Sequence, residues 1–210
     1  SAGTAQGKRY YVSTTDDSPA RIQRENNLSW KLLQRFMLKV DSLAENDALR
    51  TLLHNKGVER AWIGATDEGR LGFGEGQWKN YLDTTQLTFT NWGLDPNLIE
   101  TPQHLVPWDL GFLSDRYDYA QLLISGSTQV ADAGNESNVT LTEGQWIPKD
   151  ADNRHYFFDN GFLTFEQQDA RIVLEFDDAP YTPSVLSISD GNGYMTSSDD
   201  AVRRQALIEM

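Results

Sequence analysis

Two oxygen-bearing side chains stand on either side of a proline near the middle of the chain, in the triplet Asp95-Pro96-Asn97. Carboxylate and amide oxygens are the ligands that hard cations such as calcium prefer. The triplet follows Asn91-Trp92-Gly93-Leu94, which has neither a helical nor a strand-like period, so we predict a loop here. Such a pair in a loop favours the capture of a cation and a polar ligand over bond cleavage.

The sequence lacks the motifs of the common catalytic classes. It has no cysteine, which excludes disulfides, thiolate metal sites and cysteine nucleophiles. His54, His104 and His155 show no zinc-binding spacing, and no Gly-x-Ser-x-Gly element is present. No pair of carboxylates suited to glycoside hydrolysis stands out among 31 acidic residues. We therefore expect a protein that is not an enzyme, with a hydrolase as the alternative.

The charge balance limits the partners. With 18 basic and 31 acidic residues the net charge is -13, so the chain repels nucleic-acid phosphates and anionic membranes. No apolar run approaches the roughly 20 residues that a membrane-spanning helix needs. Aromatic residues make up 11% of the chain, enough for a packed core. We expect a folded acidic domain that neither binds nucleic acid nor inserts into a membrane.

The predicted organisation is one domain with two short appendages. Residues 1–7 are small and form a leader or linker, and residues 8–178 form the domain. Residues 179–210, rich in Asp, Ser, Gly and Pro, are a C-terminal extension or linker, or else a terminal hairpin around 190–193.

Two helices are predicted in the first third of the domain, after a short strand at 9–12 that ends in the turn-rich stretch 14–19. From Ser29 apolar residues recur at helical spacing as far as Val40, which predicts an amphipathic helix. A second helix begins with the capping box Ser42-Leu-Ala-Glu45 and ends before Gly57.

Strand-like runs follow the helices, which indicates an α+β fold and not an alternating α/β sheet. Loops separate them at 98–117 and at 148–161, two stretches without a clean period. The predicted strands are 61–65, 87–90, 119–124, 144–147 and 171–176.

Taken together, these pieces resemble a C-type lectin-like domain across roughly residues 8–178. The resemblance implies two helices packed on looped antiparallel sheets, with a long ligand-binding loop region. It places Trp62, Trp78, Trp92 and Trp146 at framework positions of the core. The missing disulfides make the chain similar to bacterial and phage members. The pieces that carry the resemblance are, in order, Tyr10-Tyr-Val12, Leu28-Ser-Trp30, Leu38 to Asn46, Trp62-Ile-Gly64, Glu75-Gly-Gln-Trp78, Phe89-Thr-Asn-Trp92, Asp95-Pro-Asn97, Tyr119-Ala120, Gly144-Gln-Trp146 and Val173-Leu-Glu-Phe176.

The resemblance implies a primary calcium site. In sugar-binding relatives a triplet with a cis proline, a later acid and an Asn-Asp pair after a tryptophan hold the ion. Here Ile147-Pro148 replaces that pair, so residues downstream must supply the oxygens, or else the triplet is a relic of the fold. The expected ligands are Asp95, Asn97, Glu100, Asp150, Asp152 and Asn153. Two sugar hydroxyls would complete the coordination and bond to Asp95, Asn97, Asp150 and Asn153.

Two further predictions concern the loops around that site. Some relatives hold auxiliary calcium ions, and the matching residues here are Asp67, Glu75 and Asp118, unless these are solvated loop acids. Trp108 and Tyr156 are expected to flank the primary site, where an exposed ring can cover the apolar face of a sugar. Either ring could instead fill a small core between loops.

The function that this resemblance implies is calcium-dependent carbohydrate binding. We expect a lectin module that binds cell-surface or extracellular glycans, as the ligand-binding domain of a bacterial surface adhesin. It would be a secreted, monomeric module of a larger chain. The alternative is a lectin-fold module that binds a protein without sugar or calcium.

Overall fold

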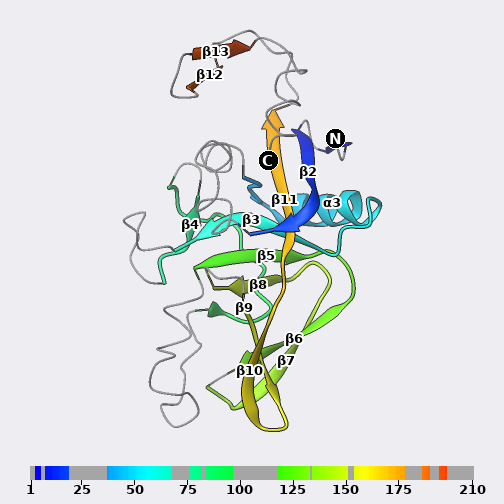
Figure 1. Cartoon of the computed structure of the whole chain (residues 1–210), viewed down its shortest axis with the longest axis vertical. Helices are drawn as coiled ribbons and strands as arrows, with labels where there is room; N and C mark the ends of the chain where they lie inside the picture. Colours follow the sequence, from blue (N-terminus) through cyan, green and yellow to red (C-terminus); the bar gives the residue numbers. More distant parts are fainter. Residues whose placement is uncertain are drawn as a thin grey trace.

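The computed structural model describes residues 3–5, 8–18, 37–67, 76–81, 84–96, 118–132, 134–150, 154–177, 186–189 and 194–197. One helix and many strands make up this part of the chain (Figure 1). The elements are β1 (Gly3–Ala5), β2 (Lys8–Asp17), α3 (Leu43–His54), β3 (Arg60–Thr66), β4 (Lys79–Asn80), β5 (Tyr119–Leu123), β6 (Ser127–Asp132), β7 (Ser137–Thr142), β8 (Trp146–Lys149), β9 (Arg154–Asp159), β10 (Phe162–Gln167), β11 (Ala170–Asp177), β12 (Leu186–Ser189) and β13 (Tyr194–Ser197).

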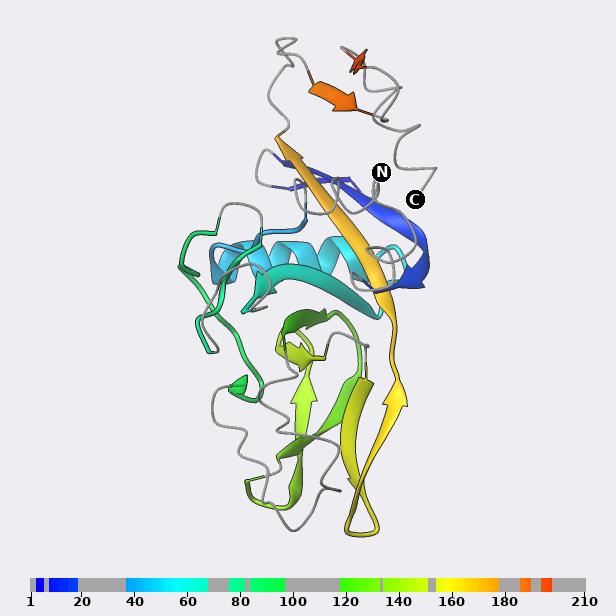
Figure 2. The same ribbon diagram turned by 60° about the vertical axis from the view of Figure 1, so that its left-hand side comes forward.

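A central sheet in the order β1-β2-β11-β3-β5-β8 organises the domain, with β4 paired to β3. Its pairs are antiparallel except β11 with β3. Strand β2 pairs with β11 from Lys8 opposite Asp177 to Asp17 opposite Ala170, which brings the first and last long strands side by side (Figures 1 and 2). The hairpins β6–β7 and β9–β10 extend beyond this sheet. The predicted α+β class is confirmed.

Helix α3 forms where the capping box predicts it. The Ser42 hydroxyl accepts the N–H of Glu45, and the Glu45 carboxylate accepts the N–H of Asp41 at 2.7 Å, so local side chains satisfy donors at the start of the helix. Leu49 and Leu53 are fully buried against the sheet, which explains why this helix docks there.

The first predicted helix falls mainly on 19–36, outside the described residues. Its predicted end is wrong, because 37–40 is not helical. Met37 forms a bridge with Leu174, and the Leu38 N–H donates to the Val173 carbonyl at 3.2 Å. Pairing with β11 therefore replaces helical hydrogen bonds here. The strand predicted at 9–12 is longer than expected and runs through the supposed break at 14–17.

Other element predictions have mixed outcomes. The strands at 61–65, 119–124 and 171–176 are confirmed, and the run at 144–147 becomes a strand only from Trp146. The run 87–90 is not a strand, and the stretch 148–161 is not irregular throughout, since it holds the end of β8 and all of β9. Strands β6, β7 and β10 were not predicted. The hairpin alternative for the C-terminal extension is confirmed by the pairing of β12 with β13.

The core contains an aromatic cluster built on Trp146, which is 1% exposed. The ring of Trp92 meets Trp146 edge to face at 5.3 Å and meets Trp78 at 4.6 Å. Trp146 Nε1 donates to Asn46 Oδ1 on α3 at 2.9 Å, so the indole has a polar partner inside the core. The framework role predicted for the tryptophans is confirmed for these three and for buried Trp62.

Close packing explains the glycine of the Trp-Ile-Gly strand. The Gly64 N–H donates to the Leu38 carbonyl at 2.6 Å. A Cβ at Gly64 would lie 2.9 Å from that same oxygen. The segment leading into α3 therefore passes too close to β3 for any side chain at this position.

An ion-pair cluster joins β2, α3 and β11. Lys8 Nζ lies 2.6 Å from Glu45 and 2.9 Å from Glu175. Burial lowers the pKa of Lys8, but hydrogen bonds to the two glutamates outweigh it, and the net pKa is raised. The lysine is therefore charged at neutral pH. No helix in the described residues is long and apolar enough to cross a membrane.

Candidate calcium-binding edge

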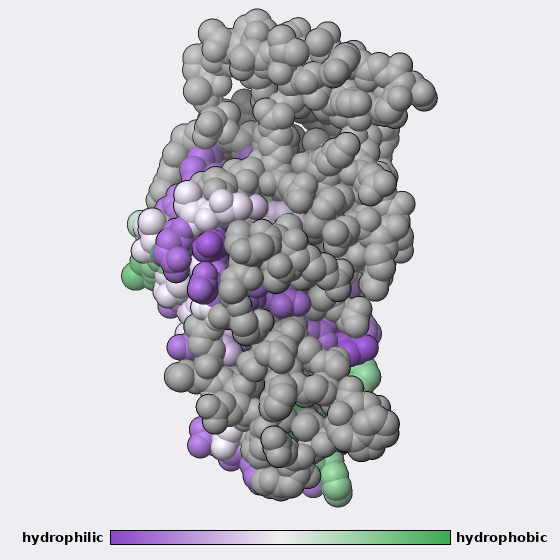
Figure 3. All heavy atoms as spheres, turned by 90° about the vertical axis from the view of Figure 1, so that its left-hand side faces the viewer, coloured by the Kyte–Doolittle hydropathy of each residue, from purple (hydrophilic) through white to green (hydrophobic). Residues whose placement is uncertain are grey.

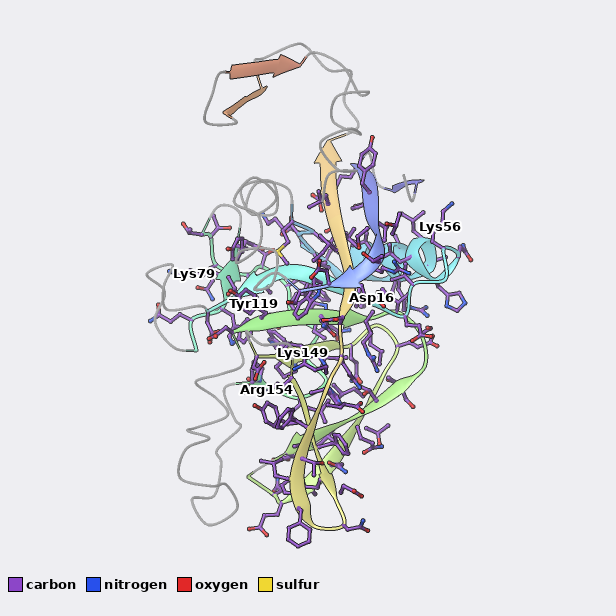
Figure 4. The ribbon with its side chains drawn as sticks, in the orientation of Figure 1. Asp16, Lys56, Lys79, Tyr119, Lys149 and Arg154 are labelled. Atoms are coloured by element: carbon purple, nitrogen blue, oxygen red, sulfur yellow. The ribbon has the colours of Figure 1, made fainter. Side chains whose placement is uncertain are left out.

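Three aspartates follow or precede neighbouring strands at one edge of the central sheet. Thr66 on β3 pairs with Tyr119 on β5, and Tyr119 pairs with Lys149 on β8. The next position along each strand toward this edge is an aspartate, so that Asp67, Asp118 and Asp150 occupy neighbouring positions and form what we call the aspartate row. Figure 4 labels Tyr119 and Lys149 in this part of the sheet.

The side chain of Asp67 is held by the residue that directly follows the predicted ligand Glu75. This side chain is buried, and its Oδ2 accepts the N–H of Gly76 at 3.0 Å. Gly76 comes directly after Glu75, which lies outside the described residues, and it has a φ of 74°, where glycine is favoured. Thr66 Oγ1 donates to the Asp118 carbonyl at 2.6 Å, which holds Asp118 beside the end of β3. Two of the three predicted auxiliary ligands, Asp67 and Asp118, are therefore neighbours.

Asp150 has internal partners. It is 3% exposed; its Oδ1 accepts the N–H of Arg154 at 2.8 Å and its Oδ2 accepts the Tyr156 hydroxyl at 3.1 Å. These bonds link the end of β8 to the start of β9. Its predicted role as a ligand is not tested, but the carboxylate bonds to residues of β9.

Tyr156 lies on β9, not in a loop. Its ring is 2% exposed and packs with Ala131, Phe158 and Leu163, so it cannot lie against a sugar. Burial raises the pKa of its hydroxyl. The structure supports the alternative for this residue, in which the ring fills a small core.

Asp95 lies on a segment that is hydrogen-bonded to β8. The Gly93 N–H donates to the Trp146 carbonyl at 3.1 Å, and Leu94 packs against the small core around Tyr156. Asp95 is half-buried. The structure has no cis peptide bond in its described residues, so the bond before Pro96 is trans, unlike the cis proline of the sugar-binding relatives. The other predicted site residues, Asn97, Glu100, Trp108, Asp152 and Asn153, lie outside the described part of the chain.

The fit to calcium differs between the two predicted sites. Within the described ranges no three acidic or histidine side chains are arranged to hold a metal. Asp67 and Asp118 occupy neighbouring positions at the ends of β3 and β5, carboxylate oxygens are the ligands that calcium prefers, and Glu75 would be the third donor. At the primary site only Asp95 and Asp150 are described, and Asp150 is engaged internally. The auxiliary site fits the residues better.

Sequence reasoning missed a buried polar network beneath this edge. Lys149 is fully buried, and its Nζ lies 3.2 Å from His155 Nδ1 and 3.2 Å from Gln168 Oε1. His155 Nε2 contacts the Gln129 carbonyl. Because a carbonyl only accepts, Nε2 carries the ring proton and Nδ1 accepts from Lys149. His155 falls in the stretch 148–161, which is predicted to be a loop, and that prediction is wrong for this residue because it lies on β9.

Burial determines the charge of this network. It lowers the pKa of His155 to about 3, with the positive charge of Lys149 as the second cause. Burial also lowers the pKa of Lys149 well below its usual value, helped by Arg60. The imidazole is therefore neutral at physiological pH. Residue spacing gives no signal for this pair, because Lys149 lies on β8, His155 lies on β9, and β6 holds the imidazole through the Gln129 carbonyl.

Comparison with known proteins gives matches among solved structures only. No family model and no curated protein matches the chain. Among solved structures it is similar to human lithostathine, with 12% identity and a TM-score of 0.43 over 83% of this chain and 95% of that one. It is also similar to the EPNH mutant of CEL-I, with 16% identity and a TM-score of 0.41 over 82% and 91%. Both proteins have the C-type lectin fold, but both TM-scores are below 0.5, so this likeness carries no argument alone.

Proposed function

We propose that the chain is a calcium-dependent carbohydrate-binding module with a C-type lectin-like fold. The observation that supports this most directly is the aspartate row, at the sheet edge where residues 97–117 lead into β5. The buried tryptophan cluster and the pairing of β2 with β11 also agree with the sequence resemblance.

Electrostatics favours a cation at this edge. Asp67 is nearly excluded from water, Asp118 occupies the neighbouring position on β5, and neighbouring carboxylates repel each other when both are ionised. A bound calcium ion, which takes six to eight oxygen ligands, would relieve that repulsion and retain sites for sugar hydroxyls. We assign Asp67, Glu75 and Asp118 to an auxiliary ion and keep Asp95 and Asn97 as candidates for the primary one.

Calcium titration tests the ion site. Isothermal titration into chelator-stripped protein should give heat, and calcium at about 100 times its Kd should stabilise the fold by about 2.7 kcal/mol. Asp67→Asn and Asp118→Asn should each weaken this binding, whereas Asp47→Asn, at an exposed position on α3, should not. Equal calcium affinity in all of these variants would exclude the aspartate row as a ligand set.

Glycan binding needs its own test. On a glycan array the calcium-loaded protein should bind a subset of sugars and lose them when a chelator is added. Binding that persists unchanged with the chelator would refute the calcium mechanism. We further propose, from the resemblance, a bacterial surface adhesin as the larger chain, an extracellular location and no catalytic activity. Turnover of any glycoside or ester in a substrate panel would contradict the last point.

A second candidate is a lectin-fold module that binds a protein. It is favoured by the internal engagement of Asp150 and by two exposed rings on the β9–β10 hairpin, Phe162 at 75% and Phe165 at 52% exposure. The face shown in Figure 3 is mainly hydrophilic where it is coloured, with small separate apolar patches. Phe162→Ala should weaken a protein partner and leave glycan binding unchanged, whereas Asp67→Asn should do the reverse.

A further inference from the structure

A polar pocket lies at the other end of β3 from the aspartate row. It has a volume of about 240 Å³ and is lined by Asp16, Gly57, Glu59, Arg60, Asp169 and Arg171. These residues come from the end of β2, the start of β3 and the start of β11. Figure 4 labels Asp16 at this end and Tyr119 at the opposite one. Except for glycine, every lining side chain is charged.

The sheet register builds the wall of this pocket. Arg171 pairs with Asp16 on one side and with Ala61 on the other, so three strands meet at its base. Arg171 Nε lies 3.1 Å from Asp16 Oδ1, and its Nη1 donates to the Ser13 carbonyl at 3.3 Å. This arginine is therefore held in place before any ligand arrives.

Arg60 has a donor that the described residues do not satisfy. Its Nη2 is 3.5 Å from Thr128 Oγ1, while its Nε is buried and has no hydrogen-bond partner in the described part of the chain. Burial lowers the pKa of this guanidinium, and the charge of Glu59 is the largest opposing cause. Arg60 lines the pocket, and a guanidinium offers several N–H donors to the acceptor oxygens of a ligand.

The wall chemistry selects the class of ligand. Arginine only donates hydrogen bonds and an ionised carboxylate only accepts them. The two guanidinium groups of the wall attract an anion, but its three carboxylates repel it. A cation is attracted by the carboxylates and repelled by the guanidinium groups. A hydroxyl both donates and accepts, so neighbouring hydroxyls can bond to both kinds of group without a charge penalty. The volume lies slightly below the about 300 Å³ at which ordinary ligand pockets begin, so the ligand is small.

We propose that this pocket binds a small neutral polyol of monosaccharide size, without calcium. The carboxylates of Glu59 and Asp169 accept its hydroxyl protons, and Arg60 donates to its oxygens. This site goes beyond the proposed calcium-dependent function and does not depend on it.

The test is an amide chemical-shift titration in the presence of a chelator, with glucose, galactose, mannose and glycerol as separate probes. At least one sugar should shift the signals of residues 57–60 and 169–171, with a Kd in the range of about 1 mM expected for small ligands. Glu59→Gln, at an exposed position, should weaken this binding at least about tenfold, and Arg60→Met should do the same. The matched control Glu136→Gln, on the β6–β7 turn, should leave it intact.

Two outcomes would overturn the proposal. One is the absence of shifts in this region with every probe. The other is tighter binding of inorganic phosphate or free lysine, which would mean that the pocket selects charge. Because Asp67→Asn should not alter these shifts, a failure of the calcium titration and a failure of the pocket titration can be told apart.

Discussion

The buried imidazole of His155 makes the stability of this domain depend on pH. Its pKa is about 3 in the folded protein, against about 6.5 in an unfolded chain. Between these values the unfolded chain binds a proton that the folded protein does not, so stability is present above pH 6.5 and falls as the pH drops. From pH 7 to pH 4.5 this one group should remove about 2.5 kcal/mol from the free energy of unfolding.

The substitution His155→Gln isolates this effect. A glutamine amide can still donate to the Gln129 carbonyl and accept from Lys149, but it carries no titratable proton. Urea unfolding, followed by tryptophan fluorescence at pH 7 and pH 4.5, gives the free energy of each protein. The loss on acidification should be smaller in the variant by about 2.5 kcal/mol.

Other groups titrate in the same range, but they are shared by both proteins. The charged side chains around His155 are Lys149 on β8, Arg60 on β3 and Glu166 on β10, and the variant keeps all three. Their contributions therefore largely cancel in the comparison. If the parent and the variant lose the same free energy on acidification, the conclusion that the buried imidazole of His155 is neutral is wrong.

Four substitutions test the packing and the ion pair that support the fold. Asn46→Ala leaves Trp146 Nε1 without its acceptor in the core, so urea unfolding should show a loss of about 1–3 kcal/mol, and Trp146→Phe should largely mask that loss in a double-mutant cycle. Gly64→Ala forces a Cβ against the Leu38 carbonyl and should lower stability by about 1–3 kcal/mol, visible as a lower Tm. Lys8→Met removes the cation between buried Glu45 and half-buried Glu175. It should destabilise the fold at pH 7 more than at pH 4, because burial raises the pKa of Glu175 and protonation of that carboxylate relieves the uncompensated charge; equal effects at both pH values would contradict the ion pair.

Local signals explain which elements could be predicted. The capping box at Ser42 satisfies its own helix end, so α3 is predictable from a few residues. The β9–β10 hairpin had a comparably strong signal that was overlooked. Asn160-Gly161 between two aromatic runs has both φ values positive, at 50° and 83°, as a two-residue hairpin turn requires. The stretch 148–161 lacks a clean period, and this favours an irregular loop over the hairpin.

The candidate site was harder to predict because it depends on pairing between distant strands. Asp67 and Asp118 are 51 positions apart in the sequence, and only the register of β3 with β5 makes them neighbours. The run 87–90 has a strand-like composition, yet Phe89 supplies a ring to the Trp146 cluster from an irregular segment. A run of buried aromatic residues does not by itself distinguish a strand from an irregular segment that fills the core.

The pairing of β2 with β11 has a mechanical consequence. Lys8 and Asp177 are direct partners, so the chain enters and leaves the domain at the same end of one antiparallel ladder. A pulling force applied at these two points would load the ladder one hydrogen-bonded pair at a time, as in opening a zipper, instead of shearing all pairs together. A tether attached there should therefore yield at low force, starting from the end of the sheet where the chain enters and leaves.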